Sequence, residues 1–157
     1  EEGKCIIMIT SDMEELLGMS DRIVVFQNGA LFPWFTVLEN VTFGPIVQKA
    51  MRKEEAEDKA MEMLGQMGLM GIENNYPSEI SSGMRRRVEI ARAMMNNPRV
   101  LLLDEPTNHL DVDAKDELKR ALTAYKGSIL MVCHEPEFYE GLATAVWDCT
   151  QFTTRLV

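Results

Sequence analysis

The chain contains the run Val100-Leu101-Leu102-Leu103-Asp104-Glu105-Pro106-Thr107-Asn108-His109-Leu110-Asp111, in which four apolar residues lead into two adjacent carboxylates. Consecutive apolar residues of this kind are typical of a strand that is buried on both faces in a parallel sheet. Asp104 and Glu105 then fall at the carboxyl edge of that sheet, where open α/β folds bind their ligands. One carboxylate there can hold a hydrated magnesium ion while its neighbour polarises an attacking water. The alternative is a buried strand that ends in an ordinary polar turn.

The rest of the chain alternates strand and helix patterns around this run. We expect strands at residues 5–10, 23–26, 99–104, 128–133 and 145–147, and helices at residues 12–19, 52–67, 84–96 and 115–125. Such alternation predicts an α/β fold in which helices flank a mostly parallel sheet. Residues 99–104 and 128–133 are expected to be adjacent strands that end at one edge, which would bring Glu105 close to His134.

Two of the expected helices carry an apolar stripe at helical spacing. The stripes consist of Ala60, Met63, Leu64 and Met67 in the first helix, and of Met84, Val88, Ala91 and Met95 in the second. Three arginines at 85–87 open the second helix, and most of their charge is expected on a solvated face. The twelve methionines are interpreted as adaptable core filler, because thioether side chains pack into irregular gaps.

Size and composition are those of one ordinary globular domain. With 157 residues and 46% hydrophobic content, the chain can bury a substantial core. The formal net charge of −9 argues against nucleic acid as a partner of the whole surface. No apolar run approaches the ~20 residues that span a bilayer, and the Glu1-Glu2 start does not resemble a signal peptide, so we expect a cytoplasmic domain without membrane insertion. Cys5, Cys133 and Cys149 lie in or beside apolar runs and are expected to be buried thiols.

The run at 100–111 resembles the Walker B motif and D-loop of ATP-binding-cassette (ABC) ATPases. Three further segments extend the resemblance: Gln27 resembles the Q-loop glutamine, Ile80-Ser81-Ser82-Gly83-Met84 resembles the signature Leu-Ser-Gly-Gly-Gln, and His134 resembles the switch histidine. Ser82 and Met84 depart from the signature pattern, which weakens the expected contact with a γ-phosphate. An exposed glutamine, a capped helix start and a structural histidine are the alternatives for these three segments.

The resemblance implies a P-loop-NTPase-like domain that binds ATP and Mg²⁺. Asp104 would bind the metal, Glu105 would be the catalytic base, and Gln27 would contact both the metal shell and the attacking water. His134 would sense the γ-phosphate as a further catalytic residue. The remaining nucleotide contacts would come from Ser81, Ser82, Gly83 and Asp111.

The resemblance also implies an organisation and partners. The chain would be a single domain, 1–157, with an α/β core of residues 1–36 and 98–157 and a small helical insertion, residues 37–97. ABC domains dimerise head to tail, so we expect a homo- or hetero-dimer with another ABC domain. The sequence leaves open whether the further partner is a transporter or a ribosome.

Parts of the chain resemble different branches of the family. Residues 23–106 look like an importer ATPase of the nitrate and taurine type, residues 107–157 look like ABC proteins that act on ribosomes, and residues 1–29 look like the end of another ABC domain. The phosphate loop G-x-x-x-x-G-K-S/T (Walker A) does not occur in the printed sequence, and Gly3-Lys4-Cys5 is its nearest fragment. These features predict a truncated or chimeric domain with impaired hydrolysis. A non-catalytic ABC-like structural or regulatory partner, or an assembled or engineered α/β chain without activity, are the alternatives.

Overall fold

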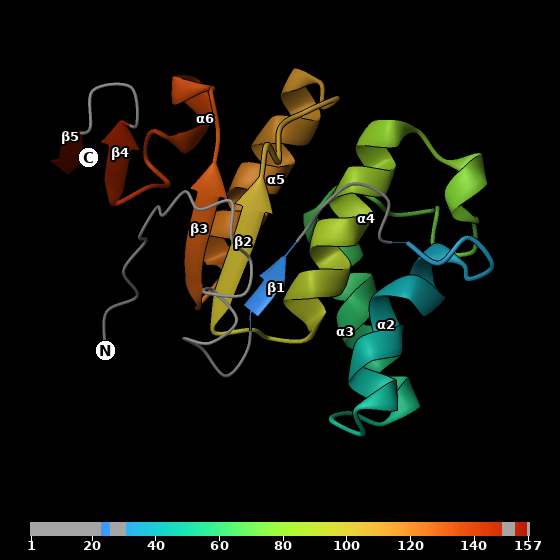
Figure 1. The fold of residues 1–157 in the computed structure, drawn as a ribbon. Helices are drawn as coiled ribbons and strands as arrows, with labels where there is room; N and C mark the ends of the chain where they lie inside the picture. Colours follow the sequence, from blue (N-terminus) through green and yellow to red (C-terminus); the bar gives the residue numbers. More distant parts are fainter. Residues whose placement is uncertain (1–22, 26–30, 149–152, 157) are drawn as a thin grey trace.

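The structure is a computed structural model that describes residues 23–25, 31–148 and 153–156. Three parallel strands form its main sheet. Strand β2 (Val100–Asp104) lies between β1 (Ile23–Val25) and β3 (Ser128–Val132), as Figure 1 shows. The α/β class, the parallel pairing and the adjacency of β2 and β3 are therefore confirmed. The strand expected at residues 5–10 and the helix expected at residues 12–19 lie outside the described residues.

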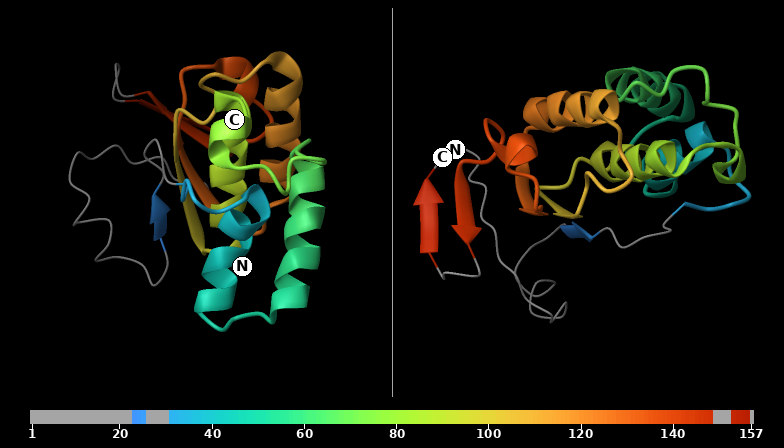
Figure 2. Two further views of the ribbon diagram at one scale, coloured as in Figure 1. Left: turned by 90° about the vertical axis from the view of Figure 1, so that its right-hand side faces the viewer. Right: turned by 90° about the horizontal axis from the view of Figure 1, so that it is seen from above.

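Strand β2 alternates between full and partial burial. Leu101 and Leu103 have no exposed surface, whereas Val100 and Leu102 are half-buried. Helices α4 (Ser82–Met95) and α5 (Val112–Ala124) lie over one face of the sheet (Figure 2), and their apolar side chains join Leu101 and Leu103 in one core cluster. Successive side chains of a strand point to opposite faces. The expectation of a strand buried throughout is therefore wrong, since alternate residues point away from these helices.

Three helices pack together beside the sheet: α2 (Val37–Val47), α3 (Lys53–Gln66) and α4 (Figure 1). Their shared core contains fully buried side chains from each helix, namely Val37, Val41, Ala60, Leu64, Val88, Ala91 and Met95. The predicted stripes on α3 and α4 provide most of this core, although Met63 and Met84 are only half-buried. Several methionines do fill the core, such as Met67 and Met94, while Met70 is 61% exposed.

Helix α2 lies within the predicted helical insertion, residues 37–97, but was not predicted as a separate helix. Gly44 and Pro45 stand inside it, and both residue types disfavour a helix interior. A capping box fixes its start: the Glu39 N–H donates to Thr36 Oγ1 at 3.2 Å, and the Thr36 N–H donates to Glu39 Oε2 at 2.8 Å. Two orphan amides of the first turn are thereby satisfied, and tertiary burial stabilises the rest of the helix.

The other helix starts also follow from their caps. Helix α4 begins two residues before the expected position, at Ser82, because the Ser81 side chain caps it. Helix α5 begins three residues early, at Val112, because Asp111 caps it in the same way. A short 3₁₀ helix, η1 (Pro77–Glu79), precedes α4, and a single turn, α6 (Pro136–Tyr139), follows β3.

The arginines at the start of α4 do not lie on a solvated face, so that expectation is wrong. Arg86 and Arg87 are each only 8% exposed. The Arg86 guanidinium donates to the Asp104 carbonyl, and Arg87 Nη1 donates to the Met67 carbonyl at 2.7 Å. Three consecutive helical residues span about 200° of the helix circumference, so they cannot all face water on a helix that is packed on two sides.

The last expected strand belongs to a separate sheet. Strand β4 (Ala145–Asp148) pairs antiparallel with β5 (Thr153–Leu156). Strand β5 was not predicted from the sequence. Figure 1 shows this pair at the end of the molecule beyond β3. Among the helices of the described residues, none has the length and apolar composition needed to cross a bilayer.

Candidate functional site

The carboxyl ends of β2 and β3 bring Glu105 and His134 together. The Glu105 N–H donates a hydrogen bond to the Val132 carbonyl at 2.9 Å, which joins the two strand ends. His134 follows two residues after β3, and its Nε2 lies 3.1 Å from Glu105 Oε1. The Glu105 side chain is 24% exposed and that of His134 is 88% exposed, so the pair opens to solvent at the sheet edge. The proximity of these two side chains, expected from the sequence, is confirmed.

The backbone at Glu105 is strained. Its φ of 44° lies in the left-handed region, which costs a residue with a side chain about 1–2 kcal/mol. A tight turn holds this conformation: the Asn108 N–H donates to the Glu105 carbonyl at 3.2 Å. Strained residues persist only where surrounding contacts over-determine them, and they cluster at functional sites. The strain therefore supports a functional assignment of Glu105 on grounds independent of any motif.

The start of α4 contacts the segment that follows Glu105. Ser81 Oγ accepts a hydrogen bond from the Met84 N–H at 3.2 Å, so the segment is a capped helix start. Ser81 and Ser82 are exposed, whereas Gly83 is buried. A Cβ atom at Gly83 would lie 2.8 Å from the His109 carbonyl oxygen, closer than real Cβ atoms approach. Only glycine allows this packing, which places two exposed serines beside the turn at 107–111.

Asp111 has a structural partner. Its Oδ1 accepts a hydrogen bond from the Ala114 N–H at 2.8 Å and so caps α5. The residue is otherwise exposed. Its expected contact with a nucleotide stays a prediction, because the carboxylate contacts the start of α5.

Contacts on both sides hold the loop that carries His134. On the N-terminal side of His134, Cys133 Sγ lies 4.0 Å from Thr107 Oγ1 and accepts a hydrogen bond from the Glu135 N–H at 3.5 Å. After it, Glu135 Oε2 accepts from Lys115 Nζ at 2.5 Å. The hydrogen bond from Lys115, together with one from Thr107, lowers the pKa of Glu135. Burial raises the pKa of the half-buried Cys133 thiol, which therefore stays protonated at neutral pH. Cys5 and Cys149 lie outside the described residues.

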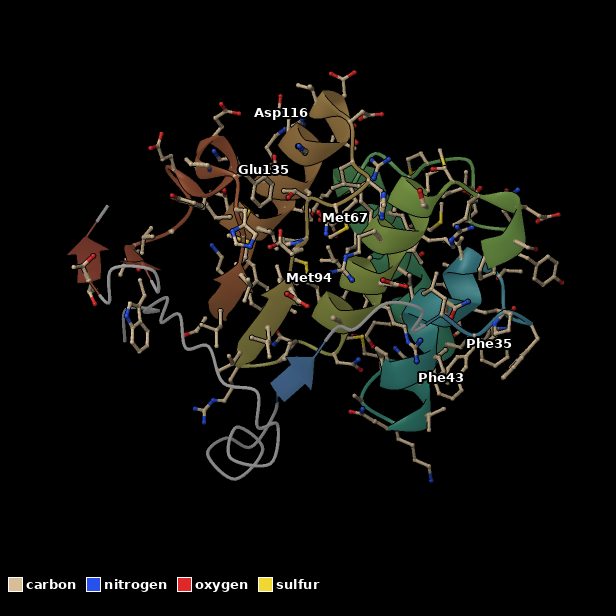
Figure 3. The ribbon with its side chains drawn as sticks, turned by 45° about the horizontal axis from the view of Figure 1, so that its top comes forward. Phe35, Phe43, Met67, Met94, Asp116 and Glu135 are labelled. Carbon is tan, nitrogen blue, oxygen red and sulfur yellow. The ribbon has the colours of Figure 1, made fainter. Side chains whose placement is uncertain are left out.

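Gln27 also lies outside the described residues, so its expected roles stay predictions. The residues that follow form an aromatic cluster that the sequence analysis missed. The Phe32 ring centroid lies 5.6 Å from that of Trp34, 5.4 Å from Phe35 and 5.0 Å from Phe43. The Arg92 guanidinium lies 4.4 Å above the Phe32 ring, and Figure 3 shows Phe35 and Phe43 together beside α2. Four aromatic residues within 32–43 were the available signal.

The acidic residues fit a magnesium ion that arrives with a nucleotide. The described part of the chain holds no group of three or more His, Cys, Asp or Glu side chains placed to bind a metal. Magnesium in nucleotide sites typically takes one or two carboxylates and completes its shell with phosphate oxygens and water. Asp104, exposed at the end of β2 beside Glu105, matches that requirement.

The sheet order and the acid–histidine pair at its carboxyl edge define a P-loop-NTPase-like α/β domain. Among solved structures, the chain is similar to the dimeric bacterial ABC transporter cassette MJ0796, with a TM-score of 0.70 and 31% identity over 85% of this chain and 61% of that one. A post-hydrolysis state of MJ0796 bound to ADP and Pi matches with a TM-score of 0.70 and 33% identity, over the same 85% of this chain and 61% of that one. The family model described as ABC transporter matches residues 11–108, and the chain belongs to this family.

Two bacterial transport proteins match three quarters or more of the chain, and a third relative matches about half of it. The L-cystine transport ATP-binding protein TcyN of Escherichia coli K12 is 44% identical over 122 residues, which cover 76% of this chain and 49% of that protein. The glutamine transport ATP-binding protein GlnQ of the same strain is 41% identical over 84% of this chain and 56% of that protein. The uncharacterised ABC transporter ATP-binding protein YfmM of Bacillus subtilis 168 is 50% identical over 51% of this chain and 15% of that protein. The chain thus spans about half the length of the transport proteins that it matches.

Proposed function

We propose that the chain is an ATP-binding domain of an import-type ABC transporter, acting in the cytoplasm, with its hydrolytic residues at the carboxyl edge of β2 and β3. The observation that carries this proposal is the contact of 3.1 Å between Glu105 and His134, directly beside Asp104. Ligands of open α/β sheets bind at this edge. The similarity to cystine and glutamine transport proteins supports the import class.

Each residue of the pair has a definite task in this proposal. The Glu105 carboxylate accepts the proton of a water that attacks the γ-phosphate, and the Glu105 contact fixes the imidazole of His134. The other ring nitrogen, Nδ1, then donates a hydrogen bond to a γ-phosphate oxygen when both ring nitrogens carry a proton. Asp104 holds Mg²⁺, which neutralises phosphate charge when it is bound. Gln27 completes the set by orienting the water.

The start of α4 would serve a second ABC domain. Ser81 and Ser82 are exposed at a helix N-terminus, where free amides and the helix dipole attract a phosphate. In a head-to-tail pair, the nucleotide that this surface contacts would be held by the phosphate loop of the partner domain. The proposed assembly is a head-to-tail homo- or hetero-dimer, with Gly83 and Asp111 beside the shared nucleotide.

Association with an intact ABC domain tests the shared site. The partner domain carries its own phosphate loop and a disabled Walker B glutamate, so that ATP is bound but not consumed. We expect ATP-dependent association that Ser81→Arg weakens. Thr36→Arg is the matched control, since it also removes an N-cap serving a backbone amide but lies at α2. Association that is absent at high concentration, or that responds equally to both variants, would contradict the shared site.

Turnover measurements test the catalytic assignment. We expect the chain alone to hydrolyse ATP slowly, because each oriented donor at a reacting site is typically worth ~3 kcal/mol and a phosphate loop supplies several. Any Mg²⁺-dependent turnover should disappear in Glu105→Gln and remain in Glu62→Gln, a matched change on the exposed side of α3. Turnover that survives Glu105→Gln would show that Glu105 is not the base.

A further inference from the structure

His134 depends on its neighbours for its position. Its side chain is 88% exposed, and its ring meets Glu105 at 3.1 Å. An exposed side chain pays conformational entropy to stay in one geometry. The backbone on either side of the histidine must therefore supply most of the restraint, so the contacts of the next residue, Glu135, become important.

Lys115 holds Glu135 from the first turns of α5. Its Nζ lies 2.5 Å from Glu135 Oε2, and the two side chains are only 28% and 35% exposed. The Lys115 N–H donates to the carbonyl of the cap residue Asp111 at 3.0 Å, so the lysine stands one turn inside a capped helix. Figure 3 shows Glu135 alongside the part of α5 that carries Asp116. The ion pair thus fastens the residue next to His134 to a rigid element.

Lys119 adds a second attachment on the same face of α5. Its Nζ donates to the Glu137 carbonyl at 2.9 Å and to the Glu140 carbonyl at 2.6 Å. Residues four apart on a helix lie on one face, so the two lysines together hold the segment 135–140. Since Lys119 remains when Lys115 is replaced, α6 should stay docked and the protein should stay folded.

We propose that Lys115 is a positioning residue that holds His134 against Glu105 by fixing Glu135. This proposal rests on the hydrolytic role proposed above for Glu105 and His134. In this proposal Lys115 acts through Glu135, with which it forms an ion pair. Lys115 lies 20 positions before Glu135 in the sequence, so its role depends on the tertiary fold.

The size of the effect follows from the tolerance of a catalytic geometry. Misplacement of a group by about 1 Å can lower a rate by ~100-fold. Because Lys119 still restrains the segment, the displacement of His134 should be smaller, and we expect Lys115→Met to lower kcat about tenfold. KM should stay unchanged, since neither Lys115 nor Glu135 is placed at the nucleotide. A variant with a smaller folded fraction would also show a lower apparent kcat at unchanged KM, so the active fraction of each variant is measured and kcat is referred to it.

A spectroscopic readout makes the test independent of turnover. The sequence has two histidines, His109 and His134, so histidine-labelled protein gives two imidazole signals, assigned with His134→Gln. In the nucleotide-free protein, Lys115→Met should move the His134 signal toward its position in the urea-denatured chain. Lys115→Arg should restore most of the native position. Lys53→Met is the matched control: Lys53 pairs with Glu57 at 3.7 Å on α3, away from the site, and its loss should move neither signal.

The outcomes separate the two proposals. If Lys115→Met leaves the His134 signal in place, Lys115 does not position the histidine, whatever the turnover. The proposal is also overturned if Lys53→Met moves the signal as far as Lys115→Met does. If the signal responds as expected but Glu105→Gln leaves turnover intact, the positional role of Lys115 stands and the hydrolytic role of the pair fails.

Discussion

Replacement of Gly83 by alanine should destabilise the protein although it improves helix propensity. Gly83 stands in the first turn of α4, and an added Cβ would meet the His109 carbonyl oxygen at 2.8 Å and Leu110 Cδ2 at 3.3 Å. The obstacle at His109 is backbone, and its φ of 65° already places it in a sparsely populated region. The turn at 107–111 must therefore shift to make room.

Two opposing effects set the stability of Gly83→Ala: the gain in helix propensity and the cost of the clash with the turn. Glycine to alanine in a helix interior gains up to about 1 kcal/mol, and less in the first turn. Relief of the clash needs a shift of about 0.6 Å, from 2.8 Å to the 3.4 Å at which ordinary contact begins. Overpacking of this kind typically costs about 1–3 kcal/mol. We therefore expect a net loss of about 1–2 kcal/mol, or a Tm lower by roughly 2–8 °C for a chain of this size.

Gly65→Ala is the matched comparison. Gly65 stands near the end of α3, and its added Cβ would meet only Met70 Sδ at 3.5 Å and Met70 Cγ at 3.8 Å, which are ordinary contacts. This variant should be as stable as the parent or more stable, by up to about 1 kcal/mol. Thermal and urea unfolding of both variants measure the difference. A Gly83→Ala protein that matches or exceeds the stability of Gly65→Ala would refute the close packing of α4 against the turn.

Three further results should follow. In urea unfolding, Glu105→Gly should be more stable than Glu105→Ala by about 1 kcal/mol, because glycine accepts a φ of 44°. At Asp104, a strand residue with ordinary φ, the alanine variant should instead be more stable than the glycine variant. Glu117→Ala should lower the free energy of unfolding by about 2 kcal/mol, because the Arg87 side chain, only 9% exposed, loses its ion-pair partner at 2.6 Å. In an Arg87→Met background the same substitution should have little effect. Equal losses in both backgrounds would disprove the coupling. Near pH 8.5, Cys133 should react with iodoacetamide more slowly in the folded chain than in the denatured chain, because a raised pKa leaves less thiolate at a given pH. Peptide mass spectrometry measures the rate of alkylation. Equal rates in the two states would contradict the burial of the thiol.

The adjacency of β2 and β3 could be predicted from sequence because each apolar run ends in polar residues, and parallel strands end at a common edge. The same rule placed Glu105 near His134. The burial of Arg86 and Arg87 could not be predicted, because their acceptors are carbonyls of Asp104 and Met67, which only the tertiary fold brings close.

Local signals were misleading or absent elsewhere. Helix α2 contains Gly44 and Pro45, so composition argued against a helix that capping and burial nevertheless stabilise. The pairing of Lys115 with Glu135 leaves no local trace in the sequence, since a helix, a strand and two turns separate them. Contacts between distant elements decide such features, and a pattern within one window cannot report them.

Titration of the full chain with Mg·ATP, followed through the His134 imidazole signal, tests the central claim that the carboxyl edge of β2 and β3 is a nucleotide site. A nucleotide site at this edge should give a progressive, saturable shift of that signal at millimolar nucleotide, smaller without Mg²⁺ and smaller again in Asp104→Asn. A His134 signal that stays fixed throughout the titration, both for the chain alone and in the presence of an intact ABC domain, would contradict it.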